Sequence, residues 1–496
     1  MPGLNASLYL GLSGLQAQQS ALNVVGHNIA NVNTPGYTRQ RAILSSGLSA
    51  VEGDITYGQG STVTSVQGIR DRFLNLQISR ETAKQSGAET RYAGVNAVAT
   101  TLGDTGATGI SAQIQAFFQS FQDLATQPES AALRTNVVGK AQAMISGLQT
   151  NYRALDDQRN NSDQAVAAMV GEVNTLTSQI AVLNQRISGE ATPGSDNDSR
   201  DQRQALTDKL ANLVGINVVE DSKGEYQITL DSGAATLVSG SASYDLVTKR
   251  PGTDADNYLQ VYSSMAGTTV DVTTGIKEGQ LGATLDLRDN ILVGFQAQLD
   301  QLAAGVARAV NKVHQTVNAV TGDRTNYFFQ SAEDNGSEGL PLSIGATPAL
   351  KKGAGWTTLY KGMVNLLSVN SAIVGSPSLI TTGAGAAGDN SKALALGQLG
   401  TAAGTVDVGS ATASFTGAVS ALVTDLGTQT QNYQTQTTTQ QNLVSALQSQ
   451  RDSLSGVNLD EEASAMMTLQ RGYQASARFI SVINQLTDQL VNQFGR

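Results

Sequence analysis

The sequence has no cysteine and only two histidines, His27 and His314, among its 496 residues. The lack of cysteine excludes disulfide bonds, thiolate metal sites and cysteine nucleophiles. Two histidines also argue against histidine-rich metal sites and most histidine-based acid–base catalysis. Charged residues make up 15% and aromatic residues 5%, so Gln, Asn, Ser and Thr must supply much of the polar surface.

The chain also lacks a basic excess and a long hydrophobic run. Its formal net charge is −10, whereas nucleic-acid and anionic-membrane binders need a basic footprint, so we expect no nucleic-acid partner. No stretch approaches the roughly 18 unbroken apolar residues of a membrane span, so we expect no membrane insertion. Residues 1–12 show no basic region, apolar block or cleavage site of a secretory signal. We therefore expect either a cytosolic chain or export without a cleaved signal peptide.

Heptad spacing near both ends of the chain is the strongest positive signal. Positions 8, 12, 15, 19, 22, 26 and 29 share one helical face, and five of these seven are apolar. They predict a helix over about 5–31, ended by the turn at 31–36, where Pro-Gly suits the centre of a type II turn. A second seam from Met466 to Phe494 has seven apolar positions of nine. Asn458 is its predicted N-cap, with Glu461 as the capping-box partner.

Inner heptad seams at 138–187, 285–316 and 415–454 predict long bundle helices, and a shorter helix over 110–124 is expected to pack on them. Between 216 and 275 the period changes to alternation, which predicts a small antiparallel β unit. Residues 47–68 are Gly-rich and predict a hinge. The predicted fold class is mainly α, elongated and multi-domain: terminal helices forming a coiled coil, a long-helix bundle, and an inserted β-rich outer domain.

The predicted domains are nested along the chain. Residues 1–66 plus 455–496 form the terminal coiled-coil domain with its linker, and 67–190 plus 284–322 plus 405–454 form the helical bundle. Residues 191–283 form the inserted β-rich domain. Residues 323–404, rich in Gly, Ala and Ser, are predicted to be an irregular region that belongs with the outer domain.

No set of residues predicts catalysis, a cofactor or a metal. Asp460, Glu461 and Glu462 are adjacent and do not share a helix face, so the first turn of a helix explains them better than a metal site. Residues 196–207 fail the calcium-loop pattern at three positions, and a capped start to a helix over 204–213 is the preferred interpretation. The glycines of 103–109 lack the lysine of a phosphate loop. The two histidines have ordinary structural explanations.

Two thin terminal helices can bury only part of their apolar surface on each other, so we expect the rest to contact neighbouring subunits. We also expect residues up to about 60 and beyond about 455 to be mobile in the free monomer and protected after assembly. The residues predicted for this assembly interface lie on the two terminal seams or in the turn between them and the body: Leu8, Leu12, Leu15, Leu22, Ile29, Asn31, Asn33, Thr34, Pro35, Gly36, Tyr37, Leu469, Tyr473, Ile480, Ile483 and Leu490.

Specific motifs at both ends resemble those of bacterial flagellar rod, hook and hook-associated proteins. They are LGLSGLQ at 10–16, GHNIANVNTPGYT at 26–38, SGVNLDEEA at 455–463 and QRGYQASAR at 470–478. Within that family, VNLDEE resembles the form found in members at the hook–filament junction. The middle agrees at 117–124, 201–219, 224–230 and 279–289, whereas residues 325–410 match no motif of the family.

The resemblance implies a structural adaptor that polymerises on the hook tip and supports filament assembly. Its implied partners are further copies of itself in a helical homo-oligomer, the hook protein, a second junction protein, an export chaperone and the type III export apparatus. The implied location is extracellular, in the flagellum, without cofactor or enzymatic activity. The alternatives are a hook or distal-rod protein of the same family, or a secreted wall hydrolase on a flagellar scaffold.

Overall fold

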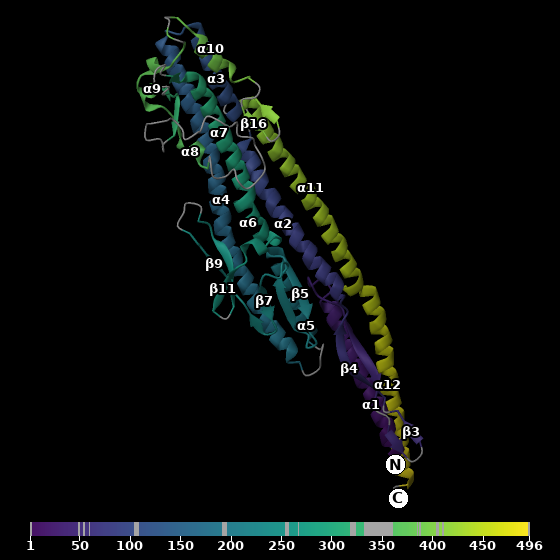
Figure 1. Ribbon diagram of the computed structural model, residues 1–496. Helices are drawn as coiled ribbons and strands as arrows, with labels where there is room; N and C mark the ends of the chain where they lie inside the picture. Colours follow the sequence, from purple (N-terminus) through teal and green to yellow (C-terminus); the bar gives the residue numbers. More distant parts are fainter. Residues whose placement is uncertain are drawn as a thin grey trace. The chain divides into compact units, whose positions relative to one another are not determined.

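The computed structural model describes residues 2–47, 50–52, 55–58, 60–103, 109–190, 196–252, 257–265, 267–317, 324–331, 361–383, 385, 388–402, 406–408 and 411–494 (Figure 1). The chain forms two compact units. The first comprises Met1–Gly87, Val166–Ala283 and Thr437–Arg496, and the second comprises Ala88–Ala165 and Thr284–Gln436. Four helices contribute residues to both units: α2 (Arg72–Leu102), α4 (Ala131–Ser188), α6 (Gly279–Asp286) and α11 (Phe415–Ser455).

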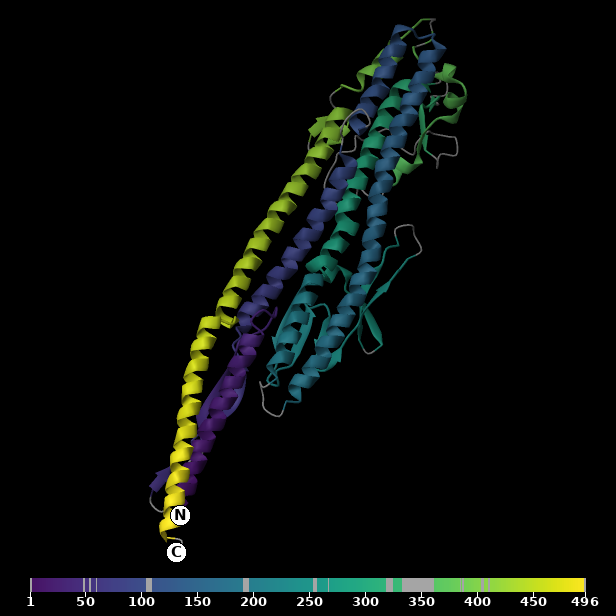
Figure 2. The same cartoon turned by 180° about the vertical axis from the view of Figure 1, so that it is seen from behind.

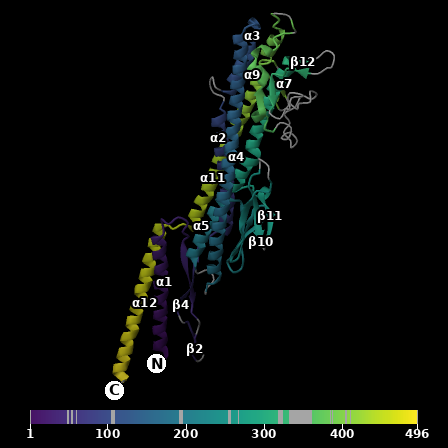
Figure 3. The same ribbon diagram turned by 90° about the vertical axis from the view of Figure 1, so that its left-hand side faces the viewer.

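In the first unit, α1 (Pro2–Ala30) and α12 (Leu459–Phe494) lie side by side in opposite directions, with both chain ends together (Figure 3). On the side away from α12 (Figure 3), α1 contacts an antiparallel hairpin of β1 (Gln40–Ser46) and β4 (Ser61–Gly68), which runs along the terminal helices in Figure 2. β2 (Ala50–Glu52) pairs with β3 (Ile55–Tyr57) between them. The segment 47–68 is therefore largely β-structure, and the prediction of a hinge was wrong.

The inserted β-rich part of the first unit follows α5 (Asn197–Leu213). An antiparallel sheet has the order β5-β6-β7-β8, and a second has the order β11-β10-β9. The bounds are β5 Ile216–Glu220, β6 Tyr226–Leu230, β7 Thr236–Ser239, β8 Ala242–Ser243, β9 Leu246–Lys249, β10 Gln260–Met265 and β11 Thr268–Asp271, followed by the 3-10 helix η2 (Thr273–Gly275). Ile216, Ile228 and Leu230 are buried, which confirms the alternation that the sequence predicts there.

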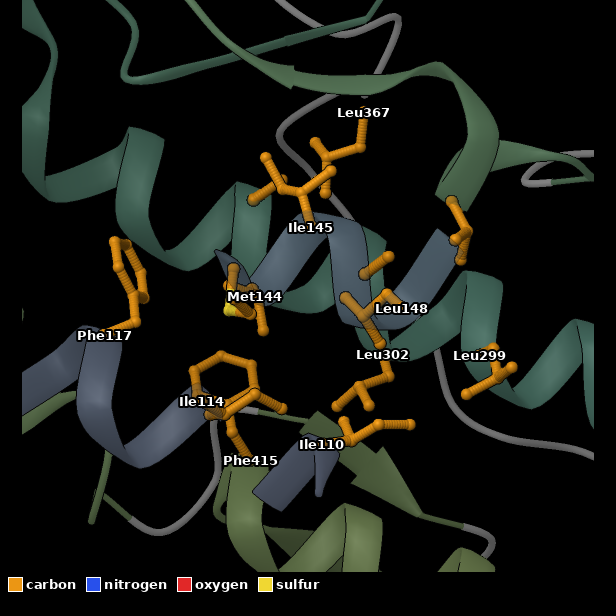
Figure 4. Packing of buried hydrophobic residues seen from close by; sticks show 14 of the residues in the cluster. Ile110, Ile114, Phe117, Met144, Ile145, Leu148, Leu299, Leu302, Leu367 and Phe415 are labelled. Atoms are coloured by element: carbon orange, nitrogen blue, oxygen red, sulfur yellow. The ribbon is translucent and has the colours of Figure 1, made fainter. Parts of the chain in front are cut away.

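The second unit is a bundle built from α2, α3 (Ile110–Thr126), α4, α7 (Leu292–His314) and α11 around one hydrophobic core. Figure 4 shows the centre of this core, where Met144 and Leu148 of α4 face Ile114 of α3 and Leu302 of α7. The aromatic rings of Phe117 and Phe328 lie 5.8 Å apart within the same cluster. Most of the predicted 138–187 seam is buried, which confirms that apolar residues at heptad spacing form the helix's inner face.

An irregular part of the second unit packs on α7. It contains β12 (Thr316–Val317), β13 (Arg324–Thr325), β14 (Phe329–Ser331), α8 (Met363–Leu366), β15 (Leu367–Val369), α9 (Ser371–Gly375), η4 (Pro377–Leu379), α10 (Ser391–Gln398), β16 (Val406–Val408) and β17 (Ala411–Ala413). It packs on α7 through α8, α10 and β14. A polar side chain of α7 binds the backbone of this irregular part through hydrogen bonds. The carboxylate of Asp300 accepts from Gly362 N and Val364 N, both at 2.9 Å. Residues 332–360 of the predicted irregular region lie outside the described residues.

Helix bounds show where sequence patterns succeed. The helices predicted at 138–187, 110–124 and 415–454 are α4, α3 and α11, and the mainly α, multi-domain class is confirmed. The predicted helix at 204–213 begins seven residues earlier, because Asp196 accepts a hydrogen bond from Ser199 N and caps α5. The 31-residue helix α2 was missed.

By length and composition, α4 contains a window apolar enough to cross a membrane, as core helices also do. Its Val137, Met144 and Leu148 are buried in the bundle core.

His314 makes the second unit sensitive to acid. Its Nδ1 lies 2.8 Å from Asn326 O, which requires a proton on Nδ1, and its Nε2 accepts from Thr381 N at 3.0 Å. Burial lowers the pKa of His314 from 6.5 to about 4. Because the folded state disfavours the charged ring, stability is complete above pH 6.5 and falls as the pH decreases towards 4.

We expect acid to destabilise the wild type more than the His314→Gln variant, whose side chain stays neutral. A shift from 6.5 to about 4 corresponds to about 3 kcal/mol once the pH is below 4. Urea unfolding at pH 7 and pH 4.5 measures the difference. Asp300, whose pKa burial raises to about 6, acts in the opposite sense but is common to both proteins. An equal acid loss in the two proteins would contradict the assignment.

Candidate assembly site at the chain ends

The contact between α1 and α12 is made by the small residues of α1. Gly11, Ala17, Ala21 and Val25 are among the buried residues of this helix. A Cβ atom at Gly11 would lie 2.7 Å from Ile480 Cγ1, and one at Gly14 would lie 3.2 Å from Ser476 Oγ. The two helices therefore approach closely at Gly11 and Gly14, where larger side chains would force them apart.

The predicted interface residues of α1 lie beside this face and are less covered. Leu8, Leu15, Leu22 and Ile29 are half-buried, and Leu12 is 43% exposed. On α12 the predicted seam does face α1: Ile483 is buried, and the others are half-buried, namely Leu469, Tyr473, Ile480 and Leu490. Sequence reasoning therefore found the inner face of α12 but missed the small-residue face of α1.

The turn after α1 has the geometry that its sequence predicts. Tyr37 N donates to Thr34 O at 3.1 Å, Pro35 follows Thr34, and Gly36 has φ +80°. These are the features of a type II turn, whose third position has a positive φ that glycine adopts without strain. Asn31 closes the helix end, since its Nδ2 donates to His27 O and its Oδ1 accepts from Thr34 Oγ1. Asn33, Thr34 and Pro35 are exposed.

Asn28, which the sequence analysis did not single out, lies at the centre of this end of the site. Only 1% of its surface is exposed. Its Oδ1 accepts from Tyr37 Oη at 2.8 Å and from Gln40 N at 2.9 Å. Its Nδ2 donates to Gln40 O at 2.8 Å and to Glu462 Oε2 at 3.1 Å. The full capacity of the amide is used to join α1, the turn, β1 and α12.

Arg39 ties the turn to the start of α12. Its Nε donates to Glu462 Oε1 at 2.7 Å, and its Nη1 donates to Glu461 Oε2 at 2.6 Å. Its backbone N donates to Ser455 O, the last residue of α11. Asn458 caps α12 as predicted, accepting from Asp460 N at 2.9 Å. Glu461, however, pairs with Arg39 instead of completing a capping box, because the arginine offers it a charge-assisted bond.

Asp201 of α5 joins the same region to the β-rich part of the unit. Its carboxylate accepts from Thr38 N at 2.9 Å and from Thr38 Oγ1 at 2.6 Å. Arg70 Nη2 donates to Asp201 Oδ1 at 2.8 Å and also to Asn197 O. Thr38, Arg39, Asp201, Arg70 and Glu462, with Asn28, form what we call the terminal junction. It fixes the inner ends of α1 and α12 to the rest of the first unit.

The charged groups around the terminal junction are paired with one another. Burial, followed by the nearby carboxylates of Asp198, Asp201 and Glu462, raises the pKa of Tyr37 well above its usual range, so its hydroxyl stays protonated. A hollow of about 1060 Å³ beside Arg70 is walled by Arg200 and Arg203, which pair with Glu220. Within the described part of the chain, no group of three or more His, Asp or Glu side chains is placed to hold a metal ion.

Three family models match consecutive parts of the chain. The model of the flagellar hook-associated protein FlgK helical domain matches residues 95–329. The flagella basal body rod protein model matches residues 8–38, which include most of α1 and the turn, and the flagellar basal body rod FlgEFG protein C-terminal model matches 448–493, which include most of α12. Both rod-protein matches therefore fall on the candidate assembly site.

Whole-chain relatives agree with these matches. Flagellar hook-associated protein 1 of Escherichia coli is 29% identical, with 97% of this chain and 98% of that one covered. Flagellar hook-associated protein 1 of Bacillus subtilis is 26% identical, with 99% of both chains covered. The solved structure of the flagellar hook junction protein FlgK from Burkholderia pseudomallei has a similar fold, with a TM-score of 0.60 and 19% identity over 76% of this chain and 100% of that chain.

The chain belongs to the family of bacterial flagellar rod, hook and hook-associated proteins. It is a structural component of the axis of the bacterial flagellum, and it assembles with other hook and filament components.

The close contact at Gly11 can be tested with a matched glycine. We expect Gly11→Ala to weaken the α1–α12 pair, because the new methyl group would meet Ile480. Gly26→Ala on the same helix meets nothing within 4 Å and should stabilise α1 by about 0.5–1 kcal/mol through helix propensity. Hydrogen exchange of α1 and α12 measures both. Equal protection in the two variants would refute the small-residue contact.

The terminal junction predicts a strong effect at Asn28. Asn28→Ala leaves Glu462 and the peptide groups of Gln40 without their buried partner, which costs about 1–3 kcal/mol for each unsatisfied group. We expect faster exchange and proteolysis of α1 and α12, with the second unit unaffected. Asn23→Ala, an exposed position on the same helix, is the control and should leave exchange unchanged.

Proposed function

We propose that this chain is the adaptor at the hook–filament junction: it polymerises on the tip of the hook and supports assembly of the filament. The names of its whole-chain relatives support this position in the axis. So does the helical-domain match over 95–329, which accompanies the rod-type termini and distinguishes the chain from hook and distal-rod members.

The observation that carries the proposal is an apolar surface that α1 and α12 leave uncovered. On α1, Tyr9 is 71% exposed and Leu12 is 43% exposed. On α12, Met467, Val482 and Leu486 are 55%, 51% and 45% exposed. Val482 and Leu486 are one helical turn apart and share a face. Burial of the exposed half of such a side chain stabilises an assembly by about 1 kcal/mol.

These side chains suit contact with neighbouring copies of the same chain. Successive subunits that stack head to tail make a heterologous contact, which continues as a helix instead of closing as a dimer. The seam residues predicted from the sequence lie next to the uncovered ones, so the interface that we propose includes them together with the 31–37 turn. The hook protein below and a second junction protein above are the proposed neighbours at the two ends of the zone.

Export completes the proposal. We propose that the chain leaves the cell through the type III export apparatus, with an export chaperone and without a cleaved signal peptide, and acts outside the cell. Its role there is structural and not enzymatic. Two observations support a structural role: Arg200 and Arg203 beside the hollow are paired with Glu220, and Arg39 of the terminal junction binds Glu462.

One experiment tests the position in the flagellum. Purified chain is incubated alone and with isolated hooks, and the hook tips are imaged by electron microscopy. We expect a short added zone at the tips and no polymer without hooks. Tubes of hook-like length formed by the chain alone would instead identify a hook protein, and bare tips would overturn the proposal.

The uncovered surface predicts a variant that folds but does not assemble. Val482→Gln together with Leu486→Gln should abolish addition at hook tips, while thermal unfolding of the monomer stays unchanged because both side chains already face solvent. The control is Leu379→Gln with Leu394→Gln, which are 45% and 46% exposed in the second unit. Normal addition by the first variant would remove the physical basis of the proposal.

A further inference from the structure

A π-turn interrupts the helix that enters the second unit's bundle. Residues Leu287–Ile291 form the π-helix η3 between α6 and α7. Such a turn contains one extra residue, so the helix faces before and after it are rotated relative to each other. Here the rotation accompanies an unusual side chain in the core: Arg288 is 2% exposed and among the largest fully buried residues.

Arg288 is the centre of an ion cluster that joins α4 to η3; its pair with Asp163 is buried, whereas the side chain of Asp289 is 40% exposed. Its Nη1 donates to Asp163 Oδ1 of α4 at 2.7 Å, and its Nε and Nη2 donate to the carboxylate of Asp289 at 2.7 and 2.8 Å. Arg159 Nε donates to Arg288 O at 3.1 Å. We call Arg159, Asp163, Arg288 and Asp289 the ion cluster. Its two positive and two negative charges balance.

The π-turn also places Leu287 against α2. An ideal Cβ atom at Gly94 would lie 2.3 Å from Leu287 Cδ2, so the leucine occupies a space that only glycine leaves open. Arg91, almost one turn before Gly94 on α2, donates from Nε to Asp286 Oδ2 at 2.8 Å. Asp286 and Leu287 therefore contact α2 at Arg91 and Gly94, and Arg288 contacts α4 at Asp163. Each contact fits one position along its partner helix.

Apolar seams alone do not determine the axial position of one helix relative to its neighbour. The facing seams of α4 and α7 repeat Leu, Ile, Val, Ala and Phe every three or four residues, so a slide of one turn exchanges one apolar contact for another. A buried charge separated from its partner has no such substitute, because the low-dielectric core does not solvate it. Although burial alone lowers the pKa of Arg288, its bonds to Asp289 and Asp163 raise it above the usual value, so the residue stays charged.

We infer that the ion cluster is a register lock, which holds the α6–α7 helix at one axial position in the bundle, against α4 and therefore also against α2, and adds little to stability. A slide of one turn would move side chains by about 5.4 Å. In an axial subunit the lock keeps lateral contact residues at fixed heights; that consequence rests on the proposed function, whereas the lock itself does not.

The test uses the absence of cysteine in the chain, since introduced thiols are then unique. Arg91→Cys with Asp286→Cys reports the native register, because these side chains are in contact. Arg91→Cys with Asn290→Cys reports a slide of one turn. Both pairs are treated with a short thiol-specific crosslinker, first in the parent and then with Asp163→Leu and Arg288→Met added. The control background is Glu81→Gln with Lys84→Gln, which removes an i,i+3 ion pair on α2.

A register lock predicts crosslinking only at 286 in the parent and control, and loss of that preference in the Asp163→Leu, Arg288→Met background. The thermal midpoint of that background should equal or exceed the parent's, because a buried ion pair replaced by apolar groups of similar size is commonly neutral or stabilising. Crosslinking only at 286 in every background, or a markedly lower midpoint, would overturn the inference. Should the double variant fail to fold, Asp163→Asn, which keeps the shape and removes the charge, must still raise crosslinking at 290.

Discussion

Bonding of asparagine side chains to the backbone of strands is the interaction on which the architecture depends. An asparagine amide carries the same donor and acceptor as a peptide group, so it can bind both the N–H and the C=O of one strand residue. Such a bond needs no charged side chain, and only 15% of the residues in this chain are charged. In the described part of the chain, four helix asparagines bind one strand-region residue in this way: Asn28 binds Gln40, Asn174 binds Leu246, Asn184 binds Tyr226 and Asn311 binds Phe329. A long helix that offers only apolar contacts would leave these strands free to slide, whereas each amide selects one residue.

The terminal helices divide their surfaces between holding the monomer together and meeting other molecules. Gly11 and Gly14 of α1 let α12 approach closely, so Ile480 of α12 packs against the α1 backbone and not against a large side chain of α1. Leu12 and Tyr9 on α1, and Val482 and Leu486 on α12, then remain at the surface. Because dispersion and burial scale with contact area, a small-residue contact stabilises the pair modestly and leaves most of the hydrophobic driving force for assembly.

The sequence predicts the parts of this fold that depend on local pattern. Apolar residues at heptad spacing gave α4 and α11, Asn458 was recognised as a cap, and the Pro35-Gly36 turn formed as its residues require. The helix α2 was missed because it buries small and polar residues such as Ala83, Ser86 and Ala88, which make no apolar stripe. Residues whose partners are distant in sequence could not be found by pattern. Asn28 and Glu462, for example, are 434 positions apart, and only the fold reveals that they share a hydrogen bond.

The position of the terminal junction bears on how the ends behave before assembly. The ion pairs and hydrogen bonds of Arg39, Asn28 and Glu462 fix the inner ends of α1 and α12, whereas the outer ends are joined mainly by side-chain packing. Local opening should therefore begin at the chain ends and decrease towards the junction, because each opened turn near the junction must also break polar bonds. The expected mobility of the ends in the free monomer is then a gradient along the pair. Helices already directed by a fixed inner end lose less conformational entropy when a neighbour binds them, so the junction favours assembly without contacting the neighbour itself.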